Sequence, residues 1–254
     1  MPTDRWTREQ TIIALRTYFI VPFNKASDSN QEIISIAKII GRKVSAVKMK
    51  IGNFGSLDPE LAKRGIVGLS GASKLDKEIW NEYASNRELL AFESAKLLSQ
   101  YSHQKIEDTI ELPDFDILEG EDKHRFVKTR VNQKFFRESI LGIYHNTCCI
   151  TGIDNPKLLV ASHIIPWAKD KENRLNPENG ICLNSIHDKA FDQGLITITP
   201  DYKVKLSRKL LQSQHQDSIQ KFFKDYEDAN IIMPDRYFPN TEFLEYHNKH
   251  IFIH

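Results

Sequence analysis

The apolar positions at the start of the chain recur with the period of a helix. Ile12, Leu15 and Phe19 fall roughly on one face, and the segment before them, Thr7-Arg8-Glu9-Gln10, has the form of a capping box. A further stretch around residues 75–100 carries bulky apolar residues at similar intervals and predicts more helix. The first 102 residues are therefore expected to form a mainly helical domain.

Two more helices are predicted between these segments. One covers about residues 30–40 and ends at Gly41, and the next is capped by Ser45. The apolar positions of the later helix are Val47, Ile51 and Phe54, at i, i+4 and i+7. Helix, short glycine turn and helix is the outline of a helix-turn-helix, a motif that binds duplex DNA.

The same region is basic. No acidic residue occurs between Glu32 and Asp58. Lys48 and Lys50 are expected on the face opposite the apolar one, where a duplex would lie, and turn residues would hold phosphates. The candidate DNA contacts here are Arg42, Lys43, Lys48 and Lys50. A three-helix packing unit with a solvated basic face explains this part of the sequence equally well.

An abrupt change of charge marks a domain boundary. Residues 103–122 hold eight acidic residues and one lysine, together with a proline and a glycine, which is typical of a linker. A basic segment follows, in which four cations are candidate phosphate contacts: Lys128, Arg130, Lys134 and Arg137. We therefore predict a helical DNA-reading domain over 1–102, an acidic linker over 103–122 and a second domain over 123–254.

The second domain contains a different pattern. Residues 158–161 form a short apolar run that predicts a strand, with His163 just beyond its end. A polar loop follows over 168–178, then the turn signal Asn179-Gly180 and a return strand over 181–183. Ser185 is expected to cap a short helix over about 186–193. This order brings His163, Asn179 and the first helical turn within reach of one another.

These residue types suit the hydrolysis of a phosphodiester. A histidine with a pKa near neutrality can take a proton from water, provided that its second ring nitrogen is oriented, commonly by a carbonyl oxygen. A hard cation such as Mg²⁺ prefers oxygen ligands, often only one or two from the protein. Each residue also has an ordinary structural explanation, and only their order and spacing together favour a catalytic site.

Three stretches carry a resemblance to a known family. They are ASHIIPW, RLNPENGICL and HDKAFDQGLI, and they resemble the HNH nucleases, whose site is a ββα-metal finger. The likeness covers roughly residues 130–206 and is closest to the bacterial restriction-type branch. It implies that His163 is the general base, that Asn179 steadies the hairpin and the base, and that Asp188 holds the metal.

The sequence departs from that family at several positions. The residue before the base is often a metal-binding aspartate or histidine, and here it is Ser162. If the helix begins one residue earlier than expected, His187 takes the metal and Asp188 lies outside the coordination sphere; Asp188 is preferred. Asp192 is interpreted as a helix C-terminal group or as a residue that contacts the metal ligands, and not as a ligand. Only Cys148 and Cys182 match the four zinc-binding cysteines of many relatives, so no structural zinc is expected.

Composition and charge indicate the general class of protein. The chain has 254 residues, 40% of them hydrophobic, a formal net charge of +1, three cysteines and no apolar run long enough for a membrane span. We expect an α+β protein that is cytoplasmic and has no membrane association. Its predicted function is a Mg²⁺- or Mn²⁺-dependent endonuclease of restriction type acting on double-stranded DNA, with modified bases as one option for its target.

Two further interpretations stay open. One is a DNA-binding regulator whose finger has lost activity, with Ser162 as the trace of that loss. The other concerns assembly: because one finger cuts one strand, a double-strand break needs two, so we expect a homodimer. The aromatic-rich segment 208–254 has enough apolar mass to pack a subunit or an interface.

Overall fold

The computed structural model describes residues 5–110, 120–212 and 216–254. The chain forms two compact units, Met1–Ser139 and Ile140–His254, so the division falls inside helix α7. The boundary expected from the sequence was the acidic segment 103–122, of which residues 111–119 lie outside the described part. Lys123, Lys128 and Lys134 of α7 contact Glu107, Glu88 and Thr109, which associates the first part of this helix with the N-terminal unit.

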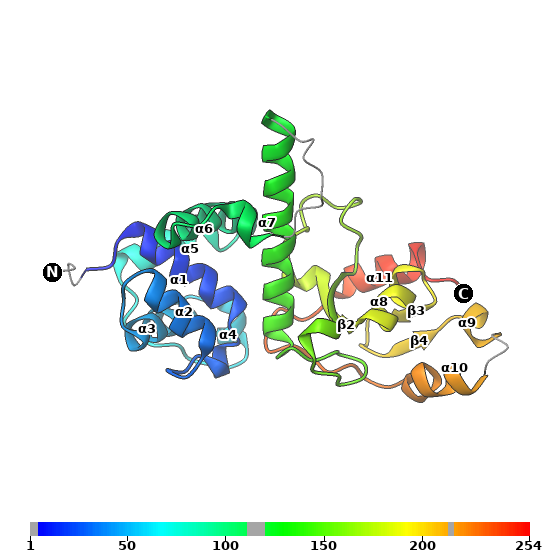
Figure 1. Ribbon diagram of the computed structural model, residues 1–254. Helices are drawn as coiled ribbons and strands as arrows, with labels where there is room; N and C mark the ends of the chain where they lie inside the picture. The colour runs from blue at the N-terminus through cyan, green and yellow to red at the C-terminus, as the bar shows by residue number, and fades with distance from the viewer. Residues whose placement is uncertain (1–4, 111–119, 213–215) are drawn as a thin grey trace. The chain divides into compact units, whose positions relative to one another are not determined.

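The N-terminal unit is helical (Figure 1). Its elements are α1 (Arg8–Ile20), the 3-10 turn η1 (Phe23–Lys25), α2 (Gln31–Ile39), α3 (Val44–Gly55), α4 (Pro59–Lys63), α5 (Lys74–Tyr83), α6 (Arg87–Ser102), the 3-10 turn η2 (Ile106–Thr109) and most of α7 (Gly120–Ile143). The capping box predicted for Thr7 and Gln10 is present at the start of α1. The third helix begins one residue before Ser45, which therefore does not cap it.

Helix α1 forms the centre of this unit. It packs against α2, α3, α5 and α6, and every residue from Thr11 to Ile20 is buried. The rings of Tyr18, Phe19, Phe54 and Trp80 meet with centroids 5.2–6.3 Å apart. Such aromatic pairs stabilise a core beyond the apolar area that they bury. The helix is thus buried on all sides, more than its few regularly spaced apolar residues predicted.

The C-terminal unit combines short helices with two hairpins. Its elements are the 3-10 turn η3 (Pro156–Leu158), β1 (Leu159–His163), the 3-10 turn η4 (Pro177–Asn179), β2 (Gly180–Asn184), α8 (Ser185–Asp192), β3 (Ile196–Ile198), β4 (Val204–Leu206), α9 (Arg208–Leu211), α10 (Gln216–Phe222), the 3-10 turn η5 (Lys224–Tyr226) and α11 (Thr241–His250). The α+β class expected from the sequence is confirmed. Within the described ranges, no helix is both long and apolar enough to cross a membrane.

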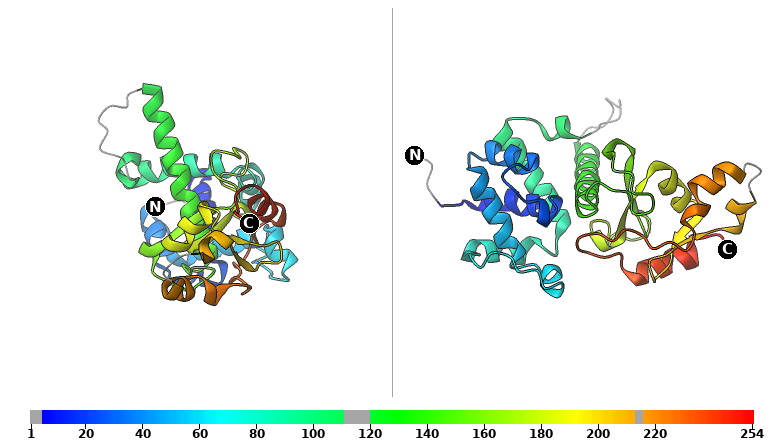
Figure 2. Two further views of the ribbon diagram at one scale, coloured as in Figure 1. Left: turned by 90° about the vertical axis from the view of Figure 1, so that its right-hand side faces the viewer. Right: turned by 90° about the horizontal axis from the view of Figure 1, so that it is seen from below.

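The strands β1 and β2 are antiparallel, with Leu159 opposite Asn184 and His163 opposite Gly180. Helix α8 packs against both strands, and the three elements, drawn from yellow-green to yellow, stay together in every view (Figure 2). The second predicted hairpin is also present, as β3 and β4. The order of strand, long loop, strand and helix thus packs α8 against the hairpin that carries His163.

Part of the aromatic-rich C-terminal segment packs on its own unit. His247 of α11 stacks on Phe191 of α8, with ring centroids 3.7 Å apart and planes 13° apart. Gly194, which ends α8 with a φ of +66°, lies so close to the Ile251 carbonyl that an added Cβ would be 2.0 Å from its oxygen. Only glycine tolerates both that conformation and that approach. These contacts pack the end of α8 against α11 and the residues that follow it.

Candidate active site

The loop between β1 and β2 is organised by one buried side chain, Asn179. Its Oδ1 accepts a hydrogen bond of 2.8 Å from the Ile165 N–H, and its Nδ2 donates to the carbonyl oxygens of Ile165 and Asn173, each at 3.2 Å. The residue is fully buried. A buried amide with three backbone partners fixes a loop because each lost bond would leave a polar group unsatisfied. Asn179 therefore determines the shape of the loop.

That loop orients His163. The His163 Nε2 lies 3.0 Å from the carbonyl oxygen of Arg174, the residue after Asn173. A carbonyl oxygen only accepts, so Nε2 carries the proton and Nδ1 is the basic nitrogen of the neutral ring. Trp167 packs edge-on against the imidazole, with centroids 5.5 Å apart. Through Asn173 and Arg174, Asn179 thus helps to hold the imidazole in one orientation.

Burial sets the charge of this imidazole. It lowers the pKa of His163 below the ordinary 6.5; the Arg174 carbonyl acts in the opposite direction, and the Arg174 charge lowers the pKa further. The ring is therefore neutral at pH 7. A neutral, oriented histidine at the end of a strand can accept a proton from a nearby water.

Helix α8, which packs against β1, supplies two carboxylates. Asp188 is half-buried, and burial raises its pKa, while the Ser162 hydroxyl lowers it. Asp192, one turn later and exposed, has its pKa raised by burial and also by the charge of Asp188. The two acids repel each other and share one face of the helix. A cation bound between them would relieve that repulsion.

Ser162 adds a third oxygen donor. Its residue is 2% exposed, and its Oγ makes no hydrogen bond of ordinary geometry to any described residue. The hydroxyl nevertheless faces Asp188, whose pKa it affects. Two carboxylates and a hydroxyl are hard oxygen donors of the type that Mg²⁺ and Mn²⁺ bind, with water as the remaining ligands. The residues present therefore fit a divalent cation of that kind.

The number of protein ligands is small. Among the described residues, no group of three or more His, Cys, Asp or Glu side chains is placed to hold a metal ion. The oxygen atoms of Ser162, Asp188 and Asp192 form a partial set only. A partial set of oxygen ligands suits Mg²⁺, which usually keeps several waters.

His187 has a structural role, in contrast to the alternative considered from the sequence. Its Nδ1 accepts a hydrogen bond of 2.7 Å from Asn184 Nδ2, and its Nε2 lies 2.7 Å from the Phe222 carbonyl oxygen. The side chain is buried against the rings of Phe223 and Tyr226. Because both ring nitrogens are engaged in the core, His187 does not fit the role of metal ligand.

Two of the predicted DNA contacts of the N-terminal unit are also committed to its own structure. Lys50 is 6% exposed and forms an ion pair of 2.6 Å with Asp76, which is fully buried. Arg42 donates to Gln10 Oε1 at 2.8 Å and stacks over the Trp6 ring. Lys50 thus has little surface for a phosphate, whereas Arg42 is half-buried, and both contacts stay predictions.

The other predicted DNA-contacting cations differ from Lys50 and Arg42 in their surroundings. Lys43 is exposed just before α3, and Lys48 pairs with Asp28 at 2.8 Å on the surface. On α7, Lys128 pairs with Glu88 at 3.0 Å, and Arg130 stacks over Phe126. Lys134 donates to the Thr109 carbonyl, and Arg137 is half-buried on the same helix. Surface pairs of this kind are weak and can be exchanged for phosphate contacts.

The sequence did not identify all the groups of this site. Asp192 was interpreted as a helix C-terminal group and Ser162 as a departure from a pattern, yet both face the same region as Asp188. The four-residue spacing of Asp188 and Asp192 is the signal that could have revealed the pair, since side chains at i and i+4 share a helix face. The role of the Arg174 carbonyl has no signal in the sequence because any residue carries a carbonyl.

Comparison with curated proteins finds no match to this chain. Comparison with family models matches residues 148–199 to the HNH endonuclease family, a span that contains β1, the loop, β2, α8 and β3. Residues 148–199 are therefore similar to the HNH endonuclease domain.

Proposed function

We propose that this protein is a metal-dependent DNA endonuclease of restriction type, which hydrolyses phosphodiester bonds in duplex DNA. The observation that carries the proposal is the His163 imidazole, whose Nε2–H donates to the Arg174 carbonyl. The same strand, β1, carries Ser162, whose hydroxyl affects the pKa of Asp188. A general base next to a partial set of oxygen ligands is the equipment for metal-assisted hydrolysis of a phosphodiester.

His163 acts as the general base in this proposal. Its Nδ1 takes a proton from the attacking water, whose oxygen forms the new bond to phosphorus in line with the departing 3′ oxygen. The pKa of His163 is lowered by burial, which keeps the base neutral before the reaction. Asn179 is a positioning residue, since it holds the loop segment that contains the Arg174 carbonyl.

Asp188 and Asp192 would hold the cation, with the Ser162 hydroxyl as a third oxygen donor. The oxygen-only donor set favours Mg²⁺ or Mn²⁺ over softer metals that prefer nitrogen and sulfur. When bound, the ion neutralises charge on the scissile phosphate and on the leaving oxygen. His187 has no part in this set because its ring nitrogens hold the core.

The N-terminal unit finds the DNA. Support comes from its order of α2, a short turn in which Gly41 has a φ of +66°, and α3, which is the outline of a helix-turn-helix. Among the predicted contacts of this segment, Lys43 is exposed and Lys48 pairs with Asp28 on the surface. On α7, we propose phosphate contacts for Lys128, Arg130, Lys134 and Arg137.

Cleavage of both strands requires two sites. A single finger holds one base and one cation site, so we propose that the protein acts as a homodimer on duplex DNA. A strict monomer on DNA would instead produce nicks. Analytical ultracentrifugation of the complex and the ratio of nicked to linear plasmid distinguish the two arrangements.

Plasmid cleavage tests the nuclease. The purified protein is incubated with Mg²⁺ and, separately, Mn²⁺ on methylated and unmethylated plasmid. His163→Ala serves as the inactive variant, and His250→Ala, at an exposed histidine of α11, is the matched control. We expect loss of cutting by orders of magnitude in His163→Ala alone. Equal cutting by both variants would contradict the assignment of the base.

The two plasmid preparations also test the target. Cutting of the methylated plasmid alone means that the N-terminal unit reads a modified base. Binding of duplex DNA with a steep salt dependence, but without cutting under either metal, would instead favour a silent regulator.

A further inference from the structure

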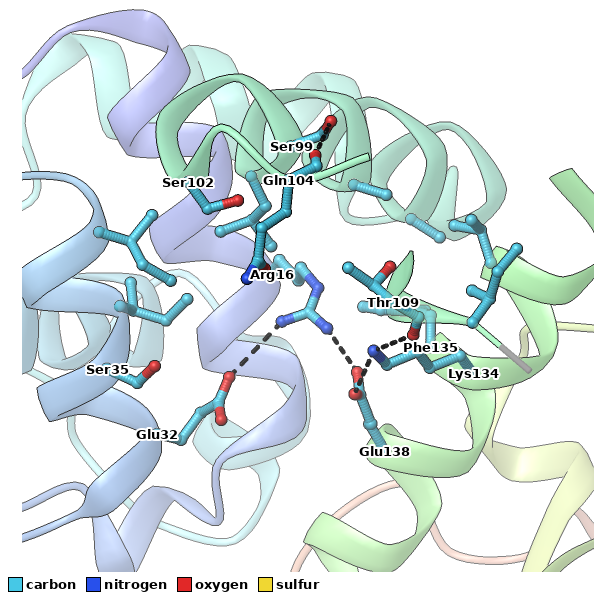
Figure 3. Close-up of a pocket in the computed structure, with 17 residues that line it drawn as sticks. Arg16, Glu32, Ser35, Ser99, Ser102, Gln104, Thr109, Lys134, Phe135 and Glu138 are labelled. Carbon is cyan, nitrogen blue, oxygen red and sulfur yellow. Dashed lines mark hydrogen bonds and ion pairs between the residues drawn. The ribbon is translucent and has the colours of Figure 1, made fainter. Parts of the chain in front are cut away.

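The N-terminal unit contains a cavity that DNA cleavage by the finger does not use. Its volume is about 230 Å³, and its walls come from α1, α2, α6, α7 and residues 109–110 (Figure 3). This is smaller than the roughly 300–1,000 Å³ of sites for drug-sized ligands. The cavity therefore suits a small molecule or a single ring system.

One wall places a donor beside an acceptor. The Arg16 guanidinium lies between two carboxylates, with Nη2 2.5 Å from Glu138 Oε2 and Nη1 3.7 Å from Glu32 Oε1 (Figure 3). The second distance is too long for a hydrogen bond. Both Nη1 and the Glu32 carboxylate can therefore turn to an occupant. The Arg16 side chain is only 10% exposed, so a hydrogen bond made there is shielded from water.

The other walls combine polar side chains, such as Ser35 and Gln104, with apolar ones. On α6, Ala91 and Ala95 lie one turn apart and leave space because their side chains are small. Ile36 and Ile39 of α2 and the Phe135 ring of α7 add flat or branched apolar surface. A planar ring can lie against such walls while its polar edge meets Arg16 and Glu32.

The charges exclude a strongly anionic occupant. Two cations, Arg16 and Lys134, face two acids, Glu32 and Glu138, so the formal charge of the lining is zero. Burial raises the pKa of Glu32, Arg16 opposes that shift and Glu138 adds to it. A phosphate would meet two carboxylates. A neutral heterocycle with both an amino group and acceptor atoms would meet complementary groups.

We propose that this cavity receives a single cytosine-type base extruded from DNA. The Glu32 carboxylate accepts a hydrogen bond from the exocyclic amino group, and the Arg16 guanidinium donates to the ring nitrogen and carbonyl oxygen beside it. Cytosine presents one donor next to two acceptors, which matches one carboxylate next to a guanidinium with several N–H groups. Proteins that inspect a base outside the stack read it by this edge and by apolar contact with its faces.

This proposal rests on the proposed action on DNA, and it adds the base that the N-terminal unit inspects. A substituent at C5 of the ring points away from the hydrogen-bonded edge, so it would meet the apolar walls. The cavity therefore accepts both cytosine and its C5-methylated form, and affinity differences between them arise from apolar contact alone.

Nucleoside binding and cleavage together provide the test. Calorimetry on the full chain compares 2′-deoxycytidine, 5-methyl-2′-deoxycytidine and thymidine. Thymidine is the discriminating probe because it lacks the amino donor and has an N–H at the ring position that must accept from Arg16. We expect the two cytosine nucleosides to bind, thymidine to bind at least about tenfold more weakly, and Glu32→Gln to weaken cytosine binding by about tenfold or more.

A cavity-filling variant gives the second measurement. Ala95→Leu occupies the cavity without a change of charge, and Ala84→Leu, at a half-buried alanine outside the lining, is the matched control. We expect Ala95→Leu to lose both nucleoside binding and plasmid cutting while its circular dichroism spectrum and melting temperature match those of Ala84→Leu.

The outcomes separate this proposal from the nuclease proposal. If the wild type cuts plasmid and Ala95→Leu cuts at the same rate, the cavity reads no base and this proposal is overturned while the nuclease stands. Thymidine binding as tightly as deoxycytidine would overturn it as well. If the wild type neither cuts nor binds DNA, both proposals fail.

Discussion

His247 should make the stability of the C-terminal unit depend on acid. This side chain is 1% exposed, its Nδ1 lies 2.8 Å from the Thr197 hydroxyl and its Nε2 lies 3.2 Å from the Phe191 carbonyl oxygen. Burial lowers the pKa of His247 from 6.5 to about 4, against the smaller opposing effect of the Phe191 carbonyl. Protonation in the folded state would bring a charge into the core beneath α8.

The sign of this pH dependence is set by the difference in proton binding between the folded and unfolded chains. Between pH 6.5 and about 4 the unfolded chain binds a proton at His247 and the folded chain does not. Acid therefore favours the unfolded state, and stability is lost as the pH falls through this window. At about 1.36 kcal/mol for each pKa unit, the loss below pH 4 is on the order of 3 kcal/mol. Above pH 6.5 His247 contributes no pH dependence.

Urea unfolding measures this effect. Trp167 is the only tryptophan of the C-terminal unit, so its fluorescence in a Trp6→Phe, Trp80→Phe background reports on that unit. His247→Gln keeps hydrogen-bonding capacity but does not titrate. The acids of α8 also titrate at low pH, and subtracting the profile of His247→Gln removes their contribution. We expect the difference between the profiles to change by about 3 kcal/mol from pH 7 to pH 4. Parallel profiles would refute the reasoning.

Three further predictions concern the site and the DNA-binding unit. Asn179→Asp loses both donated hydrogen bonds and places a negative charge near two carbonyl oxygens. Plasmid cleavage should fall by at least about a hundredfold, as it does when a catalytic group is misplaced. Retention of the wild-type rate would exclude a positioning role for Asn179. Lys50→Ala leaves the buried Asp76 carboxylate without its ion-pair partner and should lower the free energy of unfolding by about 3–5 kcal/mol. Lys43→Ala should leave that free energy unchanged and weaken DNA binding. Weaker DNA binding by Lys50→Ala with unchanged stability would instead identify Lys50 as a DNA contact. Because the pKa of His163 is lowered, cleavage should persist as the pH falls to 6.5 and decline only below it, and a decline that begins above pH 7 would contradict a neutral, desolvated base.

The sequence alone determined the features that depend on neighbouring residues. Thr7 and Gln10 form their capping box because its geometry needs only three residues of spacing. The apolar runs around His163 and Ile181 form a hairpin, and the short helix follows it, because alternation and turn residues act locally. The order of His163, Asn179 and Asp188 along the chain was sufficient to suggest an HNH nuclease.

Only the tertiary structure decided which polar groups reach the site. Lys50 and Asp188 look equally exposed in a helical pattern, yet a fully buried Asp76, distant in sequence, draws Lys50 into the core. His187 and Asp188 are neighbours, and the Phe222 carbonyl together with two aromatic rings from a later segment commits the histidine to packing. Partners so far away in sequence leave no periodic signal in the chain. The physical reason is that burial and its free-energy cost are properties of the assembled fold, while spacing and propensity are properties of the sequence.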